Sequence, residues 1–497
     1  MFVLSDSQVI AIRFCLPDTI LTMKQGIVLI TYPDSLGTNL KQLKQVLDSH
    51  YAKAIASIHV LPFFPSSGDR GFAPLHYESV DPAFGTWEDI QSLSSAYDLV
   101  FDYMINHISS KSPYLKQYLQ EGAYSSNKAL FIDYEAFFSG EPTREQVDKI
   151  YKRKNKDPYH SVTFADGTTK KLWCTFSEEQ IDLDTQSEEG KAFLKHNLEH
   201  LASRGAKLIR LDAFAYAIKK LDTDCFFVEP ETSRLLAECR DIVAPFGADV
   251  LPEIHEHYSI QLKLAQEGFP VYDFALPLLM LHALYFNTTT YLKNWFSICP
   301  RNQYTTLDTH DGIGVVDVYG LLPHEEIEKT QQHLYERGAN VKRIYSSEAY
   351  NNLDIYQVNC TYYSALGDDD RAYLVARAVQ FFSPGTPQVY YVGMLAGRND
   401  LKLLEETREG RNINRHYYSL EEIGEEQKRP VVQALKLLME LRTSHPAFTG
   451  TFVLEENEDD ATICLSWKTE NTKLTLLADF PSRSLSIEED GKSIMKL

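Results

Sequence analysis

Eight short apolar runs, separated by amphipathic stretches, dominate the pattern of hydrophobic and polar positions along the chain. Short runs that are apolar at consecutive positions are typical of parallel strands buried on both faces. The stretches Asn39–Asp48 and Glu189–Ala202 instead repeat their apolar residues with helical spacing. Strands that alternate with helices predict an α/β fold, and eight of them predict a (β/α)8 TIM barrel. The predicted strands are Ile27–Thr31, Ser57–Leu61, Leu99–Met104, Leu208–Leu211, Val250–Ile254, Val271–Phe274, Thr305–Leu307 and Gln388–Val392.

Additional domains interrupt and extend the predicted barrel. Two gaps between strand runs are too long for a single helix, so we expect inserted domains there, over the rim where barrel enzymes bind substrates. Beyond about Thr443, short alternating strands predict a small antiparallel β domain. The expected division is an N-terminal extension outside the fold at 1–23, with Met23 as a candidate start, the barrel at 24–104, 184–312 and 368–443, insertions at 105–183 and 313–367, and the β domain at 444–497.

Composition narrows the class of protein. The 497 residues suffice for a barrel with accessory domains. No apolar run approaches the roughly 18 residues of a membrane span, and the first residues lack the pattern of a secretory signal. The formal net charge of -20 argues against a nucleic-acid partner, because a phosphate backbone requires a basic face. The seven cysteines are scattered without a CxxC pair, which indicates free thiols. We therefore expect a soluble, cytoplasmic enzyme.

Two acidic residues stand at the ends of consecutive predicted strands, Asp212 after the fourth and Glu253 in the fifth. Because the carboxyl ends of barrel strands meet at one rim, we expect these carboxylates to face each other. Two facing carboxylates are typical of glycosidic-bond chemistry, in which one attacks or stabilises positive charge and the other transfers a proton. Alternatively, each acid caps its strand or pairs with a neighbouring arginine.

Polar groups at two further strand ends complete a set of four short motifs. The third strand continues into an Asn-His pair and the seventh into a His-Asp pair, so four strand ends deliver polar side chains to one rim. In their order along the chain these motifs resemble those of the α-amylase superfamily, glycoside hydrolase family 13. The four segments are Asp102 to His107, Arg210 to Asp212, Glu253 to His255 and His310 to Asp311.

Longer segments narrow the resemblance to the sucrose phosphorylase family, over nearly the whole chain from about Gly26. This resemblance implies reversible phosphorolysis of sucrose to α-D-glucose 1-phosphate and D-fructose, through a covalent β-glucosyl-enzyme. It implies sucrose, inorganic phosphate, glucose 1-phosphate and fructose as partners, and it makes a homodimer plausible. The segments are Leu61–Phe72, Ile209–Tyr216, Asp308–Gly314, Leu353–Asn359 and Gly410–Tyr418.

The resemblance assigns three catalytic roles. Asp212 would be the nucleophile, Glu253 the acid/base that protonates the departing fructose, and Asp311 the carboxylate that stabilises the transition state. Arg210 lies two residues before Asp212, on the same strand face, and can keep the nucleophile ionised. Glu253 must be protonated when the first bond breaks, so we expect it in a less charge-compensated, partly desolvated setting. A retaining mechanism also predicts carboxyl groups about 5–5.5 Å apart.

Two further sets of residues follow from the same resemblance. In the first, Asp69 and Arg411 would close the far end of the glucose pocket, while Phe72 and Tyr216 would form apolar walls. The glucosyl set is Asp69, Phe72, His107, Phe176, Gln180, Arg210, Tyr216, His310 and Arg411. In the second, Arg153 and Lys154 would bind phosphate, and arginine offers the better fork for an oxyanion. The fructose and phosphate set is Tyr151, Arg153, Lys154, Ile254, His255, Leu353, Asp354, Tyr356 and Gln357.

Other functions on the same barrel remain open at this stage. A sucrose 6'-phosphate phosphorylase would be expected to carry histidine in place of Tyr356, and phosphorylases of glucosylglycerate or glucosylglycerol are disfavoured by the same loop. A sucrose hydrolase or transglucosylase would use the same three carboxylates, and a catalytically inactive binding subunit would have lost at least one of them. The chain shows no nucleotide-binding fingerprint and no metal-ligand spacing, so we expect no cofactor and no metal.

Overall fold

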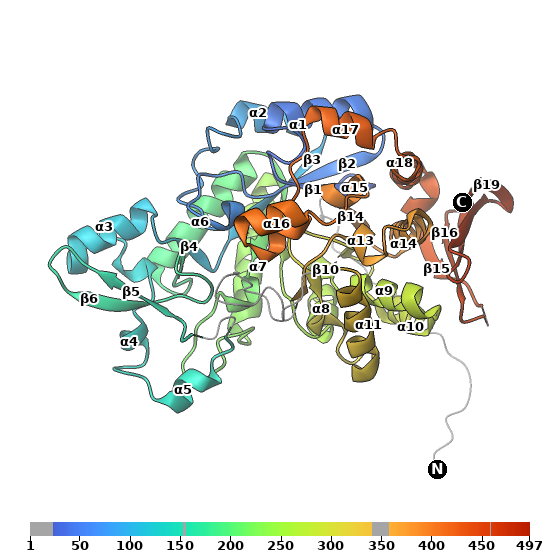
Figure 1. The fold of residues 1–497 in the computed structure, drawn as a ribbon. Coiled ribbons are helices and arrows are strands. Elements are labelled where there is room, and N and C mark those ends of the chain that lie inside the picture. The colour runs from blue at the N-terminus through green and yellow to red at the C-terminus, as the bar shows by residue number, and fades with distance from the viewer. Residues whose placement is uncertain (1–22, 153–155, 340–356, 458) are drawn as a thin grey trace, which may run out of the picture.

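The computed structural model describes residues 23–152, 156–339, 357–457 and 459–497. Its centre is a parallel sheet of eight strands in the order β10-β11-β14-β1-β2-β3-β8-β9, and β9 lies beside β10, which closes a barrel (Figure 1). The predicted barrel is confirmed, and each observed strand overlaps its predicted run. The strands are β1 (Ile27–Thr31), β2 (Ile55–Val60), β3 (Asp98–Met104), β8 (Ala206–Asp212), β9 (Asp249–Pro252), β10 (Val271–Asp273), β11 (Gln303–Thr305) and β14 (Thr386–Tyr390).

Five strands, β2, β9, β10, β11 and β14, end one or two residues before their predicted ends, because apolar runs continue into loops and helices. Val392, predicted to end the eighth strand, belongs to the short helix α15 (Tyr391–Met394). β11 ends earlier than predicted, and just after it the Thr306 hydroxyl donates a hydrogen bond to the Asp308 carbonyl at 2.7 Å. Periodicity alone does not separate a buried strand from an adjoining buried turn.

Helices cover the outside of the barrel, and their first turns are capped as the sequence favours. The Asn39 side chain accepts a hydrogen bond from a backbone N–H of α1 (Leu40–Val46), and Ser187 does the same for α6 (Glu188–Ser203). Inside the barrel, apolar side chains from six strands and from the residue directly after β10 form a separate buried cluster. Its members are Val28, Val100, Leu208, Leu251, Tyr272, Phe274 and Tyr304.

The chain between β3 and α6 forms a subdomain on one side of the barrel, at the left of Figure 1. β4 (His107–Ser109) pairs with β7 (Gln180–Asp182), and β5 (Tyr159–Thr163) pairs with β6 (Thr169–Trp173), both antiparallel. These strands and α3 (Pro113–Glu121) enclose a small hydrophobic core of their own. The β4–β7 pair begins where β3 ends, so it carries polar side chains to the barrel rim.

The chain between β11 and β14 contains a second inserted segment, at the carboxyl ends of the barrel strands. β12 (Ile313–Gly314) pairs with β13 (Gln357–Val358), and α11 (His324–Glu336) follows β12. This pairing places Gln357 next to the loop that leaves β11. Residues 340–356 lie outside the described part of the chain.

The last five strands form an antiparallel sheet at the right of Figure 1, as the alternating pattern predicts. Trp467 anchors this sheet to the barrel layer, because its indole N–H donates to the Phe382 carbonyl at 2.8 Å. The strands are β15 (Thr451–Leu454), β16 (Thr462–Lys468), β17 (Lys473–Asp479), β18 (Ser484–Glu489) and β19 (Lys492–Lys496).

Three further expectations concern the whole chain. The proposed N-terminal extension falls on residues 1–22, which lie outside the described residues, and on Met23, whose side chain packs against the cluster inside the barrel. No described helix is long and apolar enough to cross a membrane. The six described cysteines are free thiols, as predicted, and Cys15 lies outside the described range.

Candidate active site

A pocket at the carboxyl ends of the barrel strands collects most of the predicted site residues. β8 ends at Asp212, β9 ends directly before Glu253, and the loop after β11 carries Asp311, so the three carboxylates meet at one rim. The pocket has an empty volume of about 700 Å³. It is lined by Asp69, Phe72, His107, Phe176, Gln180, Asp212, Ala213, Ala215, Tyr216, Phe226, Glu253, Ile254, His255, His310, Asp311, Gln357 and Arg411.

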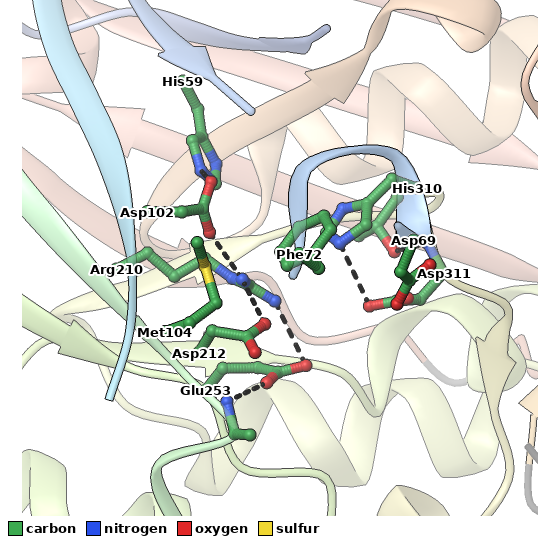
Figure 2. Close-up of polar contacts among 12 residues, drawn as sticks. His59, Asp69, Phe72, Asp102, Met104, Arg210, Asp212, Glu253, His310 and Asp311 are labelled. Carbon is green, nitrogen blue, oxygen red and sulfur yellow. Dashed lines mark hydrogen bonds and ion pairs between the residues drawn. The ribbon is translucent and has the colours of Figure 1, made fainter. Parts of the chain in front are cut away.

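A single buried guanidinium group joins the two carboxylates at the centre of this pocket. Figure 2 shows Arg210 between them: its Nη1 lies 2.9 Å from Asp212 Oδ1, and its Nη2 lies 3.1 Å from Glu253 Oε1. Nη1 also donates to Asp102 Oδ1 at 2.6 Å, since Asp102 is the neighbour of Arg210 in the β3–β8 register. Arg210 is only 3% exposed, so three carboxylates share one cation away from water.

The electrostatics of the two central carboxylates differ from the sequence-based expectation. Burial and the neighbouring Glu253 charge raise the pKa of Asp212. Burial alone would raise the pKa of Glu253, but the positive charges of Arg210 and His255 lower it. The backbone N–H of Ala213, a residue in the left-handed conformation, also donates to Glu253 Oε2 at 2.9 Å. The expectation of a weakly compensated Glu253 was therefore wrong for this arrangement, in which Glu253 has more positive partners than Asp212.

His255 lies beside Glu253 in the lining of the pocket. Its Nε2 is 3.3 Å from Glu253 Oε1, its Nδ1 is 3.5 Å from Asp317 Oδ2, and its ring stacks on Phe274 at 4.0 Å. Burial would lower the pKa of His255, but Asp317 and Glu253 raise it to about 10. His255 is therefore a cation at neutral pH. Gln357 Nε2 lies 3.3 Å from its Nε2, but both nitrogens then carry hydrogens and form no hydrogen bond, and Gln357 Oε1 accepts from the Gly312 N–H instead.

A group of charged side chains lies at the wall of the pocket around Asp311 and Asp69. Arg411 Nη1 lies 3.0 Å from Asp311 Oδ1 and 3.8 Å from Asp69 Oδ2, and Arg415 Nη1 lies 3.9 Å from the other oxygen of Asp69. Against burial, the Arg411 charge holds the pKa of Asp311 well below its ordinary value. Asp311 is thus ionised at neutral pH.

The loop that carries Asp69 is held in an unusual backbone conformation. Asp69 and Arg70 have positive φ angles of 45° and 49°, which are costly for residues with side chains. The Arg70 guanidinium lies between the rings of Tyr32 and Tyr417, at 3.9 and 4.1 Å, and its Nη2 donates to Asp34 at 3.0 Å. These contacts fix the loop, and with it the direction of the Asp69 carboxylate.

Neutral rings line the remaining walls. Phe72 stacks on His310 with ring centroids 4.8 Å apart, and Phe176 meets His107 and Tyr216 edge to face. Burial lowers the pKa of His310 to about 3 and also lowers the pKa of His107. Both imidazoles are therefore neutral at pH 7, and each can donate one hydrogen bond.

Most predicted site residues meet in this pocket, and the described ones outside its lining lie close to it. Arg210 lies beneath it, and the ring of Tyr151 contacts the lining residue Phe226 with centroids 4.6 Å apart. The remaining predicted residues fall outside the described part of the chain and keep the status of predictions. They are Arg153, Lys154, Leu353, Asp354 and Tyr356.

Several residues that support the site were not singled out from the sequence. Lys219 is one of them: its ammonium group lies 2.8 Å from Asn106 Oδ1 and 2.8 Å from Asp182 Oδ2, and it also donates to the Tyr216 carbonyl. This buried cation ties the end of β3, the first insertion and the loop after β8 together. The others are His59, Ala213, Ala215, Phe226, Asp317 and Arg415, and Asp102 was noted only as the start of a motif, without this supporting role.

The described residues include one group whose donor atoms are close enough to surround a metal ion. Ligand atoms of Glu253, His255 and Asp311 lie within 4.8 Å of one another. Arg210 and Arg411 already neutralise the two carboxylates, and His255 carries its own positive charge. We therefore assign no metal to this group.

Comparisons with known proteins agree with the resemblance of the motifs. A family model described as the α-amylase catalytic domain matches residues 34–263. A sucrose phosphorylase of Streptococcus mutans serotype c is 56% identical over 440 residues, which cover 88% of this chain and 92% of that protein. A glucosylglycerol phosphorylase of Marinobacter adhaerens is 43% identical over 94% of this chain and 96% of that protein. The crystal structure of a sucrose 6F-phosphate phosphorylase from Thermoanaerobacter thermosaccharolyticum matches with a TM-score of 0.91 at 40% identity, over 96% of this chain and 99% of that chain.

Proposed function

Because this chain belongs to the sucrose phosphorylase family of the α-amylase superfamily, we propose that it catalyses the reversible phosphorolysis of sucrose to α-D-glucose 1-phosphate and D-fructose. The observation that carries this proposal is that Arg210 contacts both Asp212 and Glu253 in a pocket that Asp69 and Arg411 also line. Asp69 and Arg411 are proposed to close one end of this pocket, so that it admits one glucosyl unit, which distinguishes this reaction from cleavage within a polysaccharide chain.

In the first half-reaction Asp212 attacks the anomeric carbon of the glucosyl unit. The bond to the fructose oxygen breaks as Glu253 delivers a proton to that oxygen, and a β-glucosyl ester forms on Asp212. The ionised Asp311, held by Arg411, stabilises the positive charge that develops on the sugar ring. Phe72 and Tyr216 are proposed to provide apolar contacts to the ring, and His310 to donate to one of its hydroxyls. His107, whose Nε2 lies 3.0 Å from the Phe72 carbonyl, is proposed to exchange this partner for a sugar hydroxyl.

The sharing of Arg210 suggests how the proton reaches Glu253. To protonate the glycosidic oxygen, the Glu253 carboxyl has to leave Arg210 Nη2, which in this arrangement lies 3.1 Å away. The guanidinium charge then acts mainly on Asp212, so ionisation of Asp212 becomes easier and protonation of Glu253 becomes easier with it. Substrate binding thus exchanges the protonation states of the two carboxyls.

In the second half-reaction phosphate attacks the glucosyl ester from the side that fructose has left. Phosphate is already an anion, so it requires little help from a general base. It does require positive charge in a protein whose net charge is -20. His255 supplies one such charge within the pocket, and Arg153 and Lys154 are proposed to supply the others.

The test is the product mixture from the purified protein with sucrose, in the presence and absence of inorganic phosphate. The proposal requires phosphate-dependent α-D-glucose 1-phosphate and little free glucose. Free glucose at the same rate without phosphate would identify a hydrolase, and turnover of sucrose 6'-phosphate alone would identify the sister specificity. We also propose that the protein is a homodimer, which sedimentation of the purified protein tests, and that it is cytoplasmic, which fractionation of cells tests.

A further inference from the structure

His59 is a buried histidine beneath the active site, outside the lining of the substrate pocket. It lies on β2 and is 1% exposed, and its Nε2 is 2.7 Å from Asp102 Oδ2 (Figure 2). Its Nδ1 has no hydrogen-bond partner among the described protein atoms. The one polar contact of this ring is therefore with Asp102.

Asp102 connects His59 to the reacting groups. One of its oxygens contacts His59 and the other accepts from Arg210 Nη1, the same nitrogen that contacts the nucleophile Asp212. Asp102 is fully buried, so no solvent compensates its charge. Against burial, His59 and Arg210 together lower the pKa of Asp102.

The hydrogen bond from His59 weakens the attraction of the Asp102 carboxylate for the Arg210 guanidinium group. A buried carboxylate with one partner lost interacts more strongly with the partner that remains. Without His59, Asp102 would draw the guanidinium toward itself and would repel the negative charge of Asp212 more strongly. Apart from Asp102, the charged or titratable groups around the small cavity at His59 are Arg210, Tyr272, His310 and Asp311, and its other walls are Ile30, Phe274 and Thr309.

We propose that His59 is a positioning residue for the glucosyl transfer: its hydrogen bond to Asp102 keeps the Arg210 guanidinium available to the nucleophile. This inference rests on the proposed function, since it assumes that Asp212 is the nucleophile. His59 does not contact the substrate, and it acts through two intervening side chains.

The test uses α-D-glucosyl fluoride, whose leaving group needs little proton donation, so the acid limb of kcat/KM reports mainly on ionisation of the nucleophile. His59→Leu removes the N–H donor, and we expect its acid limb to move to higher pH by about one unit, a tenfold loss of rate below the limb. His59→Gln keeps an N–H donor and should restore most of the wild-type profile.

Ser57→Ala is the matched control, because Ser57 lies two residues earlier on the same buried strand face and its hydroxyl has no partner among the described atoms. Its acid limb should match that of the wild type.

A folded His59→Leu enzyme with the wild-type limb would overturn the inference, and so would a limb in His59→Gln shifted as far as in His59→Leu. If His59→Leu does not fold, the acid limbs of His59→Gln and His59→Asn are compared. A wild-type limb in His59→Gln and a shifted limb in His59→Asn, whose shorter side chain brings its N–H donor less close to Asp102, would support the inference. Wild-type limbs in both variants would overturn it. Fluoride release by the wild type without any phosphorolysis of sucrose would overturn the proposed function alone.

Discussion

Arg411 Nη1 lies 3.0 Å from Asp311 Oδ1, so the side chain proposed to close the pocket also holds the carboxylate proposed to stabilise the transition state. Arg411 is thereby proposed to limit the size of the bound substrate and also to assist the chemical step. Its loss should affect both the binding of sucrose and the chemical step.

Arg411→Leu is expected to lower kcat/KM for sucrose by about 10²–10³-fold, as is typical when a charge-stabilising donor is removed from an active site. Steady-state kinetics measure this, with both kcat and KM determined. Arg398→Leu is a suitable control, because Arg398 is 64% exposed and pairs with Asp368 at the surface. A rate for Arg411→Leu within threefold of the wild type would show that the pocket is not closed by this residue.

Lys219→Met is expected to lower stability by about 3–5 kcal/mol at pH 7, because it leaves the buried carboxylate of Asp182 without its cation. Against burial, Lys219 lowers the pKa of Asp182, so this stabilisation is present above the unfolded pKa and is lost as pH falls through the folded pKa. The difference in melting temperature between variant and wild type should therefore shrink in strong acid. Lys195→Met, at an exposed helix position, is the control and should leave the melting temperature unchanged. An equal effect of both substitutions would contradict the stabilisation of the buried Asp182 carboxylate by Lys219.

Asp317→Asn is expected to weaken the use of phosphate at alkaline pH. Asp317 helps to raise the pKa of His255 to about 10, so in the wild type the His255 charge is present below the ordinary pKa and is lost only as pH rises toward about 10. In the variant the charge is lost nearer neutrality, and the KM for phosphate should rise about tenfold above pH 8 relative to the wild type. Glu325→Gln removes one exposed negative charge on α11 and controls for net charge. An unchanged phosphate KM across the pH range would show that His255 does not contact the acceptor.

The spacing of the two central carboxyl groups is a geometric prediction. In a crystal structure with a glucosyl ligand, the carboxyl groups of Asp212 and Glu253 should lie about 5–5.5 Å apart, as in retaining enzymes. A spacing near ~8 Å would leave room for a water molecule and would contradict the double displacement.

The barrel and the three carboxylates could be predicted because their signals are local. Continuous apolar runs identify strands such as β8, and Asp212 and Glu253 stand where such runs end. The pairing of Arg210 with Asp212 also follows from a two-residue spacing on one strand face.

The contacts of the supporting residues could not be predicted, because they join distant parts of the chain. His59 and Asp102 lie 43 positions apart, and Lys219 reaches Asn106 over 113 positions, so no spacing connects them. The environment of Glu253 depends on the left-handed backbone at Ala213 and on Arg210 reaching both acids, which only the folded geometry defines.

The most direct test of the central claim is a single-turnover experiment on Glu253→Gln with α-D-glucosyl fluoride. This substrate needs little acid catalysis, and without its general base the enzyme should hydrolyse the ester slowly, so a glucosyl group should accumulate on Asp212 and be found on the corresponding peptide by mass spectrometry. Added phosphate should then discharge it as α-D-glucose 1-phosphate. A glucosyl group on another residue, no labelled peptide, or discharge to free glucose irrespective of phosphate would contradict the account.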